Sequence, residues 1–361
     1  MSGLSFFLAF VGFALLVILH ELGHFATAKA VGMRVEKFSL FFPPTLFSKK
    51  VGETVYAVGA IPAGGYVKIS GMNPAEDLPD EVRTRAYYSQ PVWKRVVVIA
   101  AGPVMNLILA FLLLFVFYAA VGPYETGVAA VEKGYPAAGQ LQVNDQIVAV
   151  DGRRVDPEEI SQRVAAHRCP ERPPRKGCQA ETPVRLTVLR DGERRHLELT
   201  PVYDPQAKRT RIGFQYGATD KREDLSLGAA ADYTVDQFWY FTKATLELPA
   251  RLINPEQRKE ISGVVGSYET TRQTILNQPA DVIGILAIIS LSLAIVNLFP
   301  FLPLDGGHIF WAIVEKIRRK PVPFSVMERA GVVGFMLVIL IFLVGLSNDI
   351  DRLSGEGFQV R

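Results

Sequence analysis

Cysteine and histidine are scarce in this sequence. Its 361 residues include only two cysteines, Cys169 and Cys178, and five histidines. Two cysteines cannot supply a four-cysteine zinc site or a disulfide-rich scaffold. They can form one bridge if their segment faces an oxidising compartment, and the alternative is two unpaired thiols in a mobile loop. A net charge of +3 is too small to indicate a nucleic-acid partner.

Charge is absent from the N-terminal stretch 4–19. The N-terminus also lacks the basic start and the small-residue cleavage site of a secretory signal peptide. We therefore expect residues 3–30 to be retained as a membrane span. Across the chain, 49% of residues are hydrophobic and 21% are charged, a combination that indicates membrane helices together with a water-exposed part.

Four apolar runs are long enough to cross a bilayer, which takes about 20 residues in a helix. They cover residues 3–27, 96–121, 281–299 and 330–347. Lysine and arginine gather between the first and second runs and between the third and fourth. The positive-inside rule puts both of these segments in the cytoplasm. We therefore expect both termini and the long segment 122–280 on the outer side.

The first run ends in the motif HELGH, which contains His20, Glu21 and His24. Two histidines four positions apart lie on one helix face and can bind one metal ion, with the neighbouring glutamate as a base. The alternative is a pair of buried histidines satisfied by hydrogen bonds. The membrane setting argues against that alternative, because polar groups in membrane helices are costly and are usually functional.

A second polar cluster follows the third run at a similar depth. His20 comes about 17 residues after the outer end of its helix, or roughly 25 Å of rise, which puts it nearer the cytoplasmic side. The third run reaches the same side at Asn297, and two prolines then break the helix before Asp305. Asp305 is either a third metal ligand or a turn residue, and His308 is a competing ligand.

The remaining segments predict smaller elements. Residues 35–72 are rich in β-formers and alternate around a Gly-Gly turn, which predicts a small sheet or hairpin beside the membrane. Residues 124–217 carry hairpin signals and suit one small domain. Residues 218–280 show partial helical periodicity and are expected to form an outer connector. The membrane parts are then residues 1–123 and 281–361.

Five motifs, in this order, resemble those of the site-2 proteases, and most closely the bacterial branch typified by the regulator of sigma-E protease. The motifs are HELGH at 20–24, IPAGGYVKISGM at 61–72, AAGPVMN at 100–106, GYPAAGQLQVNDQIVAVDG at 134–152 and NLFPFLPLDGG at 297–307. The chain departs from the best-known enterobacterial member in having one PDZ-sized segment instead of two. Its second proline before the aspartate also stands one position later than usual.

The resemblance implies a polytopic α-helical membrane protein with four transmembrane helices, a membrane-associated β-hairpin or sheet and one extracytoplasmic PDZ-like α+β domain. It implies one Zn²⁺ ion bound by His20, His24 and Asp305, with Glu21 as the general base. The implied activity is cleavage of transmembrane segments of single-span proteins already cut outside, such as anti-sigma factors or remnant signal peptides. The expected substrate-binding residues are Asn297, Asn106, Gly64, Gly65, Tyr66, Val67, Lys68 and Ile69.

The resemblance also implies a location and partners. The chain is expected in the bacterial cytoplasmic (inner) membrane, with its active site toward the cytoplasm, and the PDZ-like domain is expected to bind a peptide or the outer portion of a substrate. Helix–helix adhesion is the alternative role for Asn297 and Asn106, and an ordinary interfacial hairpin is the alternative for residues 64–69. Two other functions stay open, a PDZ adaptor with a structural metal site and a metal transporter. The transporter is disfavoured because four spans show no obvious repeat.

Overall fold

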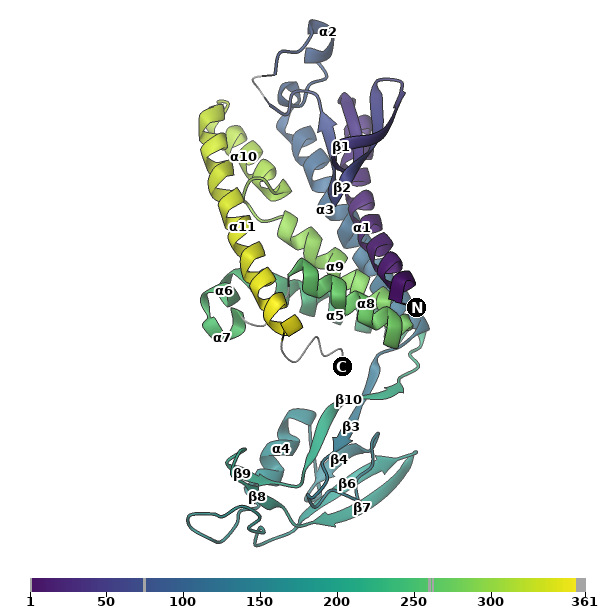
Figure 1. The fold of residues 1–361 in the computed structure, drawn as a ribbon, viewed down its shortest axis with the longest axis vertical. Helices are drawn as coiled ribbons and strands as arrows, with labels where there is room; N and C mark the ends of the chain where they lie inside the picture. Colours follow the sequence, from purple (N-terminus) through teal and green to yellow (C-terminus); the bar gives the residue numbers. More distant parts are fainter. Residues whose placement is uncertain (1, 74–75, 259–260, 262, 355–361) are drawn as a thin grey trace. The chain divides into compact units, whose positions relative to one another are not determined.

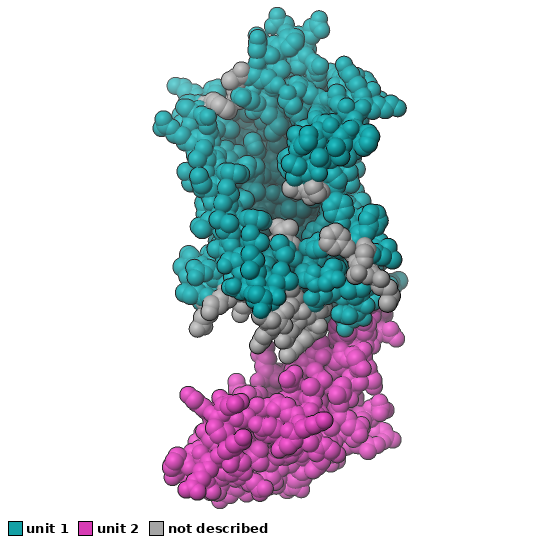
Figure 2. Space-filling view, in the orientation of Figure 1, with its two compact units in different colours: residues 1–120, 227–361 teal, residues 121–226 magenta. Residues whose placement is uncertain are grey.

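The protein forms two compact units. The structure is a computed structural model that describes residues 2–73, 76–258, 261 and 263–354. Unit 1 consists of Met1–Ala120 and Leu227–Arg361, and unit 2 of Val121–Ser226 (Figure 2). Each unit has its own hydrophobic core.

Four long apolar helices form the body of unit 1 (Figure 1). They are α1 (Ser2–Ala30), α3 (Val92–Ala120), α9 (Val282–Asn297) and α11 (Phe324–Ser354). Within the described residues, each supplies a stretch long and apolar enough to cross a membrane. The four apolar runs are therefore confirmed as candidate spans. Helix α11 is longer than expected at both ends, because helical hydrogen bonding continues through the polar residues that flank the apolar run.

Helix α3 is the centre of this bundle and packs against both α1 and α9. Its close approach to α1 depends on two glycines. A Cβ atom at Gly23 would overlap the carbonyl of Ala101, and a Cβ atom at Gly102 would overlap the His24 imidazole. Small residues let membrane helices come this close, where dispersion between backbones replaces the hydrophobic effect as the driving force.

Strands β1 (Val35–Val51) and β2 (Thr54–Ile69) form an antiparallel sheet, as the β-forming residues predicted. Both strands fold back, so residues 37–40 pair with 55–58 on one side and with 65–68 on the other. Residues 65–68, here called the edge segment, therefore lie at the border of the sheet. The register gives the edge segment no second strand among the described residues.

A charged cluster fastens the sheet to the end of α1. Glu53, in the turn between β1 and β2, accepts hydrogen bonds from Arg85 at 2.8 Å and from Lys29 at 2.7 Å. The bonds from Arg85 and then from Lys29 lower the pKa of Glu53 to about 2. Because these side chains are partly exposed, the cluster contributes mainly to orientation and little to stability.

Helix α10 (Asp305–Arg318) was not anticipated from the sequence. The sequence indicated a helix break before Asp305 and left that residue as either a metal ligand or a turn residue, whereas the structure has the break and then a new helix that starts at Asp305. Two glycines let this helix begin against the preceding loop. Cβ atoms at Gly306 and Gly307 would overlap the backbone of Leu298 and Phe301.

Seven further helical elements, counted in the described residues, complete unit 1. Helix α5 packs on α3 and α9, and helix α8 packs on α1. The helices of the connector begin at Leu227, later than the expected 218, because the last strand of unit 2 continues to Arg222. These elements are α2 (Asp80–Arg83), η1 (Tyr87–Ser89), α5 (Leu227–Leu246), α6 (Leu248–Ile253), α7 (Pro255–Arg258), α8 (Val264–Asn277) and η2 (Pro279–Asp281).

Unit 2 consists of short antiparallel strands and one helix around an aliphatic core that includes Val150, Ile160 and Leu186. Its largest sheet has the order β5-β4-β6-β7, and β10 pairs with β3 and β8 with β9. The β6–β7 hairpin turns at Asp191 and Gly192, whose φ values of 51° and 83° suit a type I′ turn. The elements are β3 (Tyr124–Val131), β4 (Gln146–Val150), β5 (Arg153–Arg154), α4 (Pro157–Ala166), β6 (Val184–Arg190), β7 (Glu193–Leu199), β8 (Val202–Asp204), β9 (Arg209–Arg211) and β10 (Phe214–Arg222).

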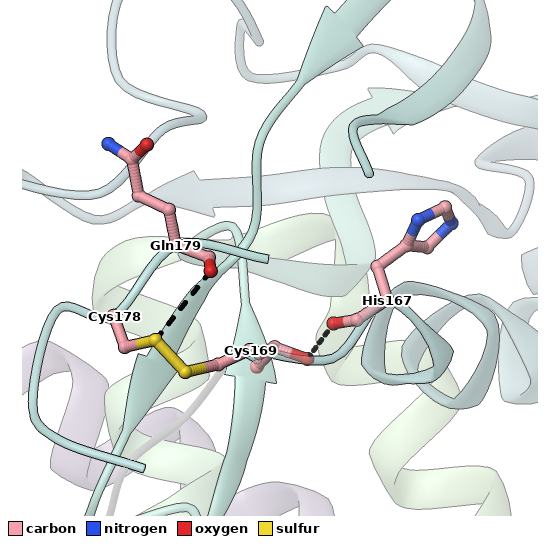
Figure 3. Close-up of a disulfide and its surroundings, with 5 residues drawn as sticks. His167, Cys169, Cys178 and Gln179 are labelled. Atoms are coloured by element: carbon pink, nitrogen blue, oxygen red, sulfur yellow. Dashed lines mark hydrogen bonds between the residues drawn. A yellow bond between two sulfur atoms is a disulfide. The ribbon is translucent and has the colours of Figure 1, made fainter. Parts of the chain in front are cut away.

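The two cysteines form a disulfide. Figure 3 shows the Cys169 and Cys178 sulfur atoms bonded, with His167 and Gln179 beside them. The backbone N–H of Tyr203 donates to the Cys178 carbonyl at 2.8 Å, so the base of the loop is also attached to β8. The sequence left the pairing of the two thiols open, and the structure joins them.

Candidate metal centre

Three side chains from two helices of unit 1 converge on one point. His20 Nε2 lies 3.2 Å from Asp305 Oδ2, His24 Nε2 lies 3.3 Å from the same oxygen, and the two Nε2 atoms are 3.2 Å apart. Both histidines are almost buried, with exposed fractions of 6% and 7%. Asp305 stands 285 positions after His20 in the chain, so only the fold of unit 1 brings the three together.

The size of this triangle fits a zinc ion. In a tetrahedral site with bonds of about 2.0–2.1 Å, neighbouring ligand atoms lie about 3.3 Å apart. Two imidazoles and one carboxylate also leave the fourth position free, as a catalytic site requires. A second group in the described residues, Cys169, Glu171 and Cys178, brings potential ligand atoms together. Its two sulfur atoms are bonded to each other and are not available as thiolates.

Hydrogen bonds behind the histidines orient them. His24 Nδ1 lies 2.9 Å from the Val98 carbonyl, so it must donate, which leaves the Nε2 lone pair facing the triangle. His20 Nδ1 lies 3.3 Å from the side-chain nitrogen of Asn106, whose amide oxygen is buried and has no hydrogen-bond partner. Exchanging the two amide atoms, which have nearly the same shape, makes that oxygen the acceptor of a hydrogen bond from His20 Nδ1.

A cavity of about 400 Å³ opens beside the triangle, and Glu21 lies on its wall. The backbone of Val67, in the edge segment, lies beside the Glu21 carboxylate. A Cβ atom at Gly65 would come within 2.9 Å of the Glu21 side chain. The glycine therefore lets the edge segment pass directly beside this carboxylate.

The structure places most of the predicted substrate-binding residues on this cavity. Asn297, at the end of α9, lines it from one side. Phe42, which the sequence gave no reason to select, also lines the cavity and stacks on Tyr66 with ring centroids 6.0 Å apart. The predicted residues on the wall are Asn297, Gly64, Gly65, Tyr66, Val67 and Ile69.

Two residues predicted to bind substrate lie elsewhere. Lys68 is not on the cavity wall and forms ion pairs with Glu36 at 2.6 Å and Glu76 at 3.2 Å. Burial opposes ionisation of Glu36, but the bonds from Lys68 and Ser70 outweigh it and lower the pKa of Glu36. The physical reason is the fold-back of the sheet, which pairs Lys68 with Lys37 and so brings it beside Glu36.

Asn106 is the second such residue. It is fully buried against His20 and does not line the cavity. Its backbone carbonyl accepts a hydrogen bond from Ser290 of α9 at 3.0 Å, which joins the two helices. This placement favours a role in orienting His20. His308, the competing third ligand, is likewise not part of the triangle.

Gly102 and Pro103 of the motif AAGPVMN suggested close helix packing or a kink. The structure adds what the sequence did not indicate, which is that Gly102 gives the His24 imidazole its space. An apolar multi-helix bundle, a HExxH helix and a carboxylate at one buried point define the class of multi-pass membrane metalloproteases.

Comparisons with known proteins agree with that class. The model of peptidase family M50 matches residues 8–341. Three bacterial relatives carry the name "putative zinc metalloprotease". The protein of Fusobacterium nucleatum is 28% identical and covers 97% of this chain and 99% of its own length. The protein of Campylobacter jejuni is 28% identical and covers 94% of this chain and 92% of its own length. The protein of Brucella suis is 30% identical and covers 92% of this chain and 92% of its own length.

The chain belongs to peptidase family M50, the site-2 protease family, and is a zinc metalloendopeptidase with Zn²⁺ as its cofactor.

Proposed function

We propose that the chain is an intramembrane endopeptidase whose zinc ion is bound by His20, His24 and Asp305 and whose general base is Glu21. The observation that carries this proposal is the triangle of ligand atoms beside a cavity, among helices apolar enough to span a membrane. A hydrolytic site in this setting serves substrates that lie within the bilayer.

Each residue has a separate task in this proposal. When bound, the zinc ion polarises the peptide carbonyl and makes the attacking water more acidic. Glu21, on the cavity wall, accepts a proton from that water and later gives it to the leaving amine. The hydrogen bond from His24 to the Val98 carbonyl keeps the Nε2 lone pair directed at the ion. Asn297, at the other side of the cavity, donates to the substrate backbone.

The edge segment binds the substrate as an added strand. A substrate helix hides its peptide bonds, and pairing with a strand edge exposes them. Three observations support this proposal: the edge segment has no second strand among the described residues, its residues Gly65, Tyr66 and Val67 line the cavity, and at Gly65 its backbone passes directly beside Glu21.

Cysteine cross-linking tests strand addition. In a chain carrying Glu21→Gln, Tyr66→Cys should cross-link to single cysteines at every second position of a substrate, because side chains alternate along a strand. Ser48→Cys, in the exposed outer part of the same sheet, serves as the control and should give no such pattern. A period of three to four positions would show a helical substrate and contradict the proposal.

The proposed location is the bacterial cytoplasmic membrane, with the active site toward the cytoplasm and both termini and unit 2 outside. The lysines and arginines between the first two spans and between the last two support this orientation. The disulfide of unit 2 supports it independently, because such bonds persist in oxidising compartments.

The proposed substrates are single-span proteins already cut on the outer side, such as anti-sigma factors or remnant signal peptides. Unit 2 is proposed to be a PDZ-like domain that binds a peptide or the outer portion of the substrate. Its support is the combination of a four-stranded antiparallel sheet with helix α4 around one core.

Cleavage in proteoliposomes tests this function. The full chain should cut a single-span substrate within its apolar segment, nearer the cytoplasmic end, and mass spectrometry of the products locates the cut. Removing the metal with a zinc chelator should abolish cleavage, and added Zn²⁺ should restore it. A substrate that keeps a folded outer domain should be cut more slowly. Cleavage only in water-exposed loops, or cleavage that survives the chelator, would show that the proposal is wrong.

A further inference from the structure

Arg95 and Glu315 form a partly buried ion pair outside the metal triangle, in which the Glu315 side chain is 27% exposed. Arg95 Nη1 donates to Glu315 Oε2 at 2.9 Å, and Arg95 Nη2 donates to Glu315 Oε1 at 2.7 Å. The Arg95 side chain is only 9% exposed. Two parallel bonds between planar groups fix an angle as well as a distance. This contact therefore constrains the orientation of α10 against α3.

On α10, the ion pair and the metal triangle share one helix face. Asp305, Ile309, Ala312 and Glu315 follow one another at spacings of four, three and three residues, which keeps them on the same side. Ile309 packs in the cluster that contains Val98, and Ala312 is buried. Glu315 lies ten residues after Asp305, or about 15 Å along the helix axis. The helix is thus held near both ends of this face.

On α3, Arg95 lies one turn before Val98, whose carbonyl holds His24. Residues 95–98 of α3 therefore make two contacts with the site. The Val98 carbonyl holds His24, and the Arg95 side chain holds α10, the helix that begins at Asp305. Among the described elements, α3 is also the one that packs extensively against α10. Loss of the ion pair would leave mainly apolar contacts between α10 and α3, and such contacts allow one helix to slide and rotate against the other.

We propose that the Arg95–Glu315 pair is a positioning element of the metal centre, which holds α10 at the angle that brings Asp305 to the two histidines. This inference rests on the proposed metal-binding role of His20, His24 and Asp305. The competing explanation is that the pair contributes only to stability. The two explanations differ in one respect: two apolar residues often replace an ion pair that is removed from water without loss of stability, but they do not fix an angle.

The test measures metal binding by the full chain in detergent. Zinc affinity is obtained by competition with a chelator, and the geometry of the site is read from the visible spectrum of the Co²⁺ form. Arg95→Met should weaken zinc binding about tenfold, the lower end of the 10–100-fold loss typical when groups that orient metal ligands are removed, and should change the spectrum. The kcat for a model substrate should fall while its KM stays the same.

Further variants separate positioning from stability. Arg95→Lys keeps the charge but loses the two-pronged geometry, and it should show a smaller loss of zinc affinity. The charge-exchanged variant, Arg95→Glu with Glu315→Arg, should recover affinity and spectrum toward those of the unmodified chain. The double variant Arg95→Met with Glu315→Met should unfold at the usual temperature yet keep the weakened zinc binding.

Several outcomes would overturn the inference. The double apolar variant could bind zinc with the affinity of the unmodified chain and show the same Co²⁺ spectrum. The Arg95–Glu315 pair would then be only a stabilising contact. Unchanged zinc affinity and an unchanged Co²⁺ spectrum in both single variants, Arg95→Lys and Arg95→Met, would lead to the same conclusion. If Arg95→Met does not fold, the double apolar variant and Arg95→Lys decide the question. Zinc binding that survives loss of Asp305 would instead refute the proposed metal ligands, so the two failures are distinguishable.

Discussion

Glu21→Gln should lower the kcat for peptide cleavage by roughly 10²–10⁴-fold, the usual contribution of a positioned general base, while zinc stays bound. Glu21 lies on the cavity wall and outside the triangle of ligand atoms, so the amide removes the proton acceptor without removing a ligand. Glutamine has the same shape, and the contact with the Val67 backbone can persist. The measurement pairs a cleavage rate in proteoliposomes with the zinc content of the purified chain.

A matched control separates this effect from a general loss of carboxylates. Glu328→Gln changes an exposed side chain on α11 and should leave the cleavage rate unchanged.

The same substitution at Glu21 also addresses the adaptor and transporter hypotheses. A chain whose metal site is structural would keep its function after Glu21→Gln, and metal uptake into sealed vesicles that survives the substitution would support a transporter. Undiminished cleavage would remove Glu21 from the mechanism.

Asp305→Asn should weaken zinc binding by more than roughly 100-fold, the upper end of the losses seen when residues behind metal ligands are changed. Its Oδ2 is the one carboxylate oxygen in the triangle, 3.2 Å and 3.3 Å from the two Nε2 atoms. Asparagine preserves the shape of the side chain but removes the charge that helps offset the dication. Zinc per chain after dialysis against a chelator measures the loss, and cleavage should stop in parallel.

His308→Ala is the control for Asp305. His308 lies one turn further along α10 and was the competing third ligand, but it is not in the triangle. This variant should keep nearly all of its zinc. The opposite pattern, in which His308→Ala loses the metal and Asp305→Asn keeps it, would make His308 the third ligand and would require α10 to turn relative to its position in the structure.

Much of the membrane part could be predicted from the sequence because its signals are local. A run of apolar residues without charge requires a helix in the bilayer, since the backbone has no other way to satisfy its hydrogen bonds there. The pair His20 and His24 shares a helix face by spacing alone, and Glu21 is next to it by sequence. The strands at 35–72 followed from β-forming residues and alternation.

Other parts of the site depended on contacts between distant residues. Whether Asp305 was a ligand or a turn residue could not be decided from spacing, because the answer depends on how α10 packs against α3. Asn106 was assigned to the substrate, whereas the crossing of α1 and α3 at Gly102 puts it behind His20. Lys68 was grouped with its strand neighbours, although the fold-back of the sheet turns it toward Glu36 and Glu76.

The sequence by itself therefore determined the four apolar helices, the strands at 35–72 and the histidine half of the candidate metal centre, because periodicity and spacing within one element are fixed by backbone geometry. The tertiary structure brings Asp305, which the family resemblance implied as the third ligand, to the two histidines although it stands 285 positions from His20. It also decided which nitrogen of each histidine faces inward and which edge of the sheet reaches Glu21. These features arise from side chains of different elements packing at one point, and no local pattern in the chain encodes that packing.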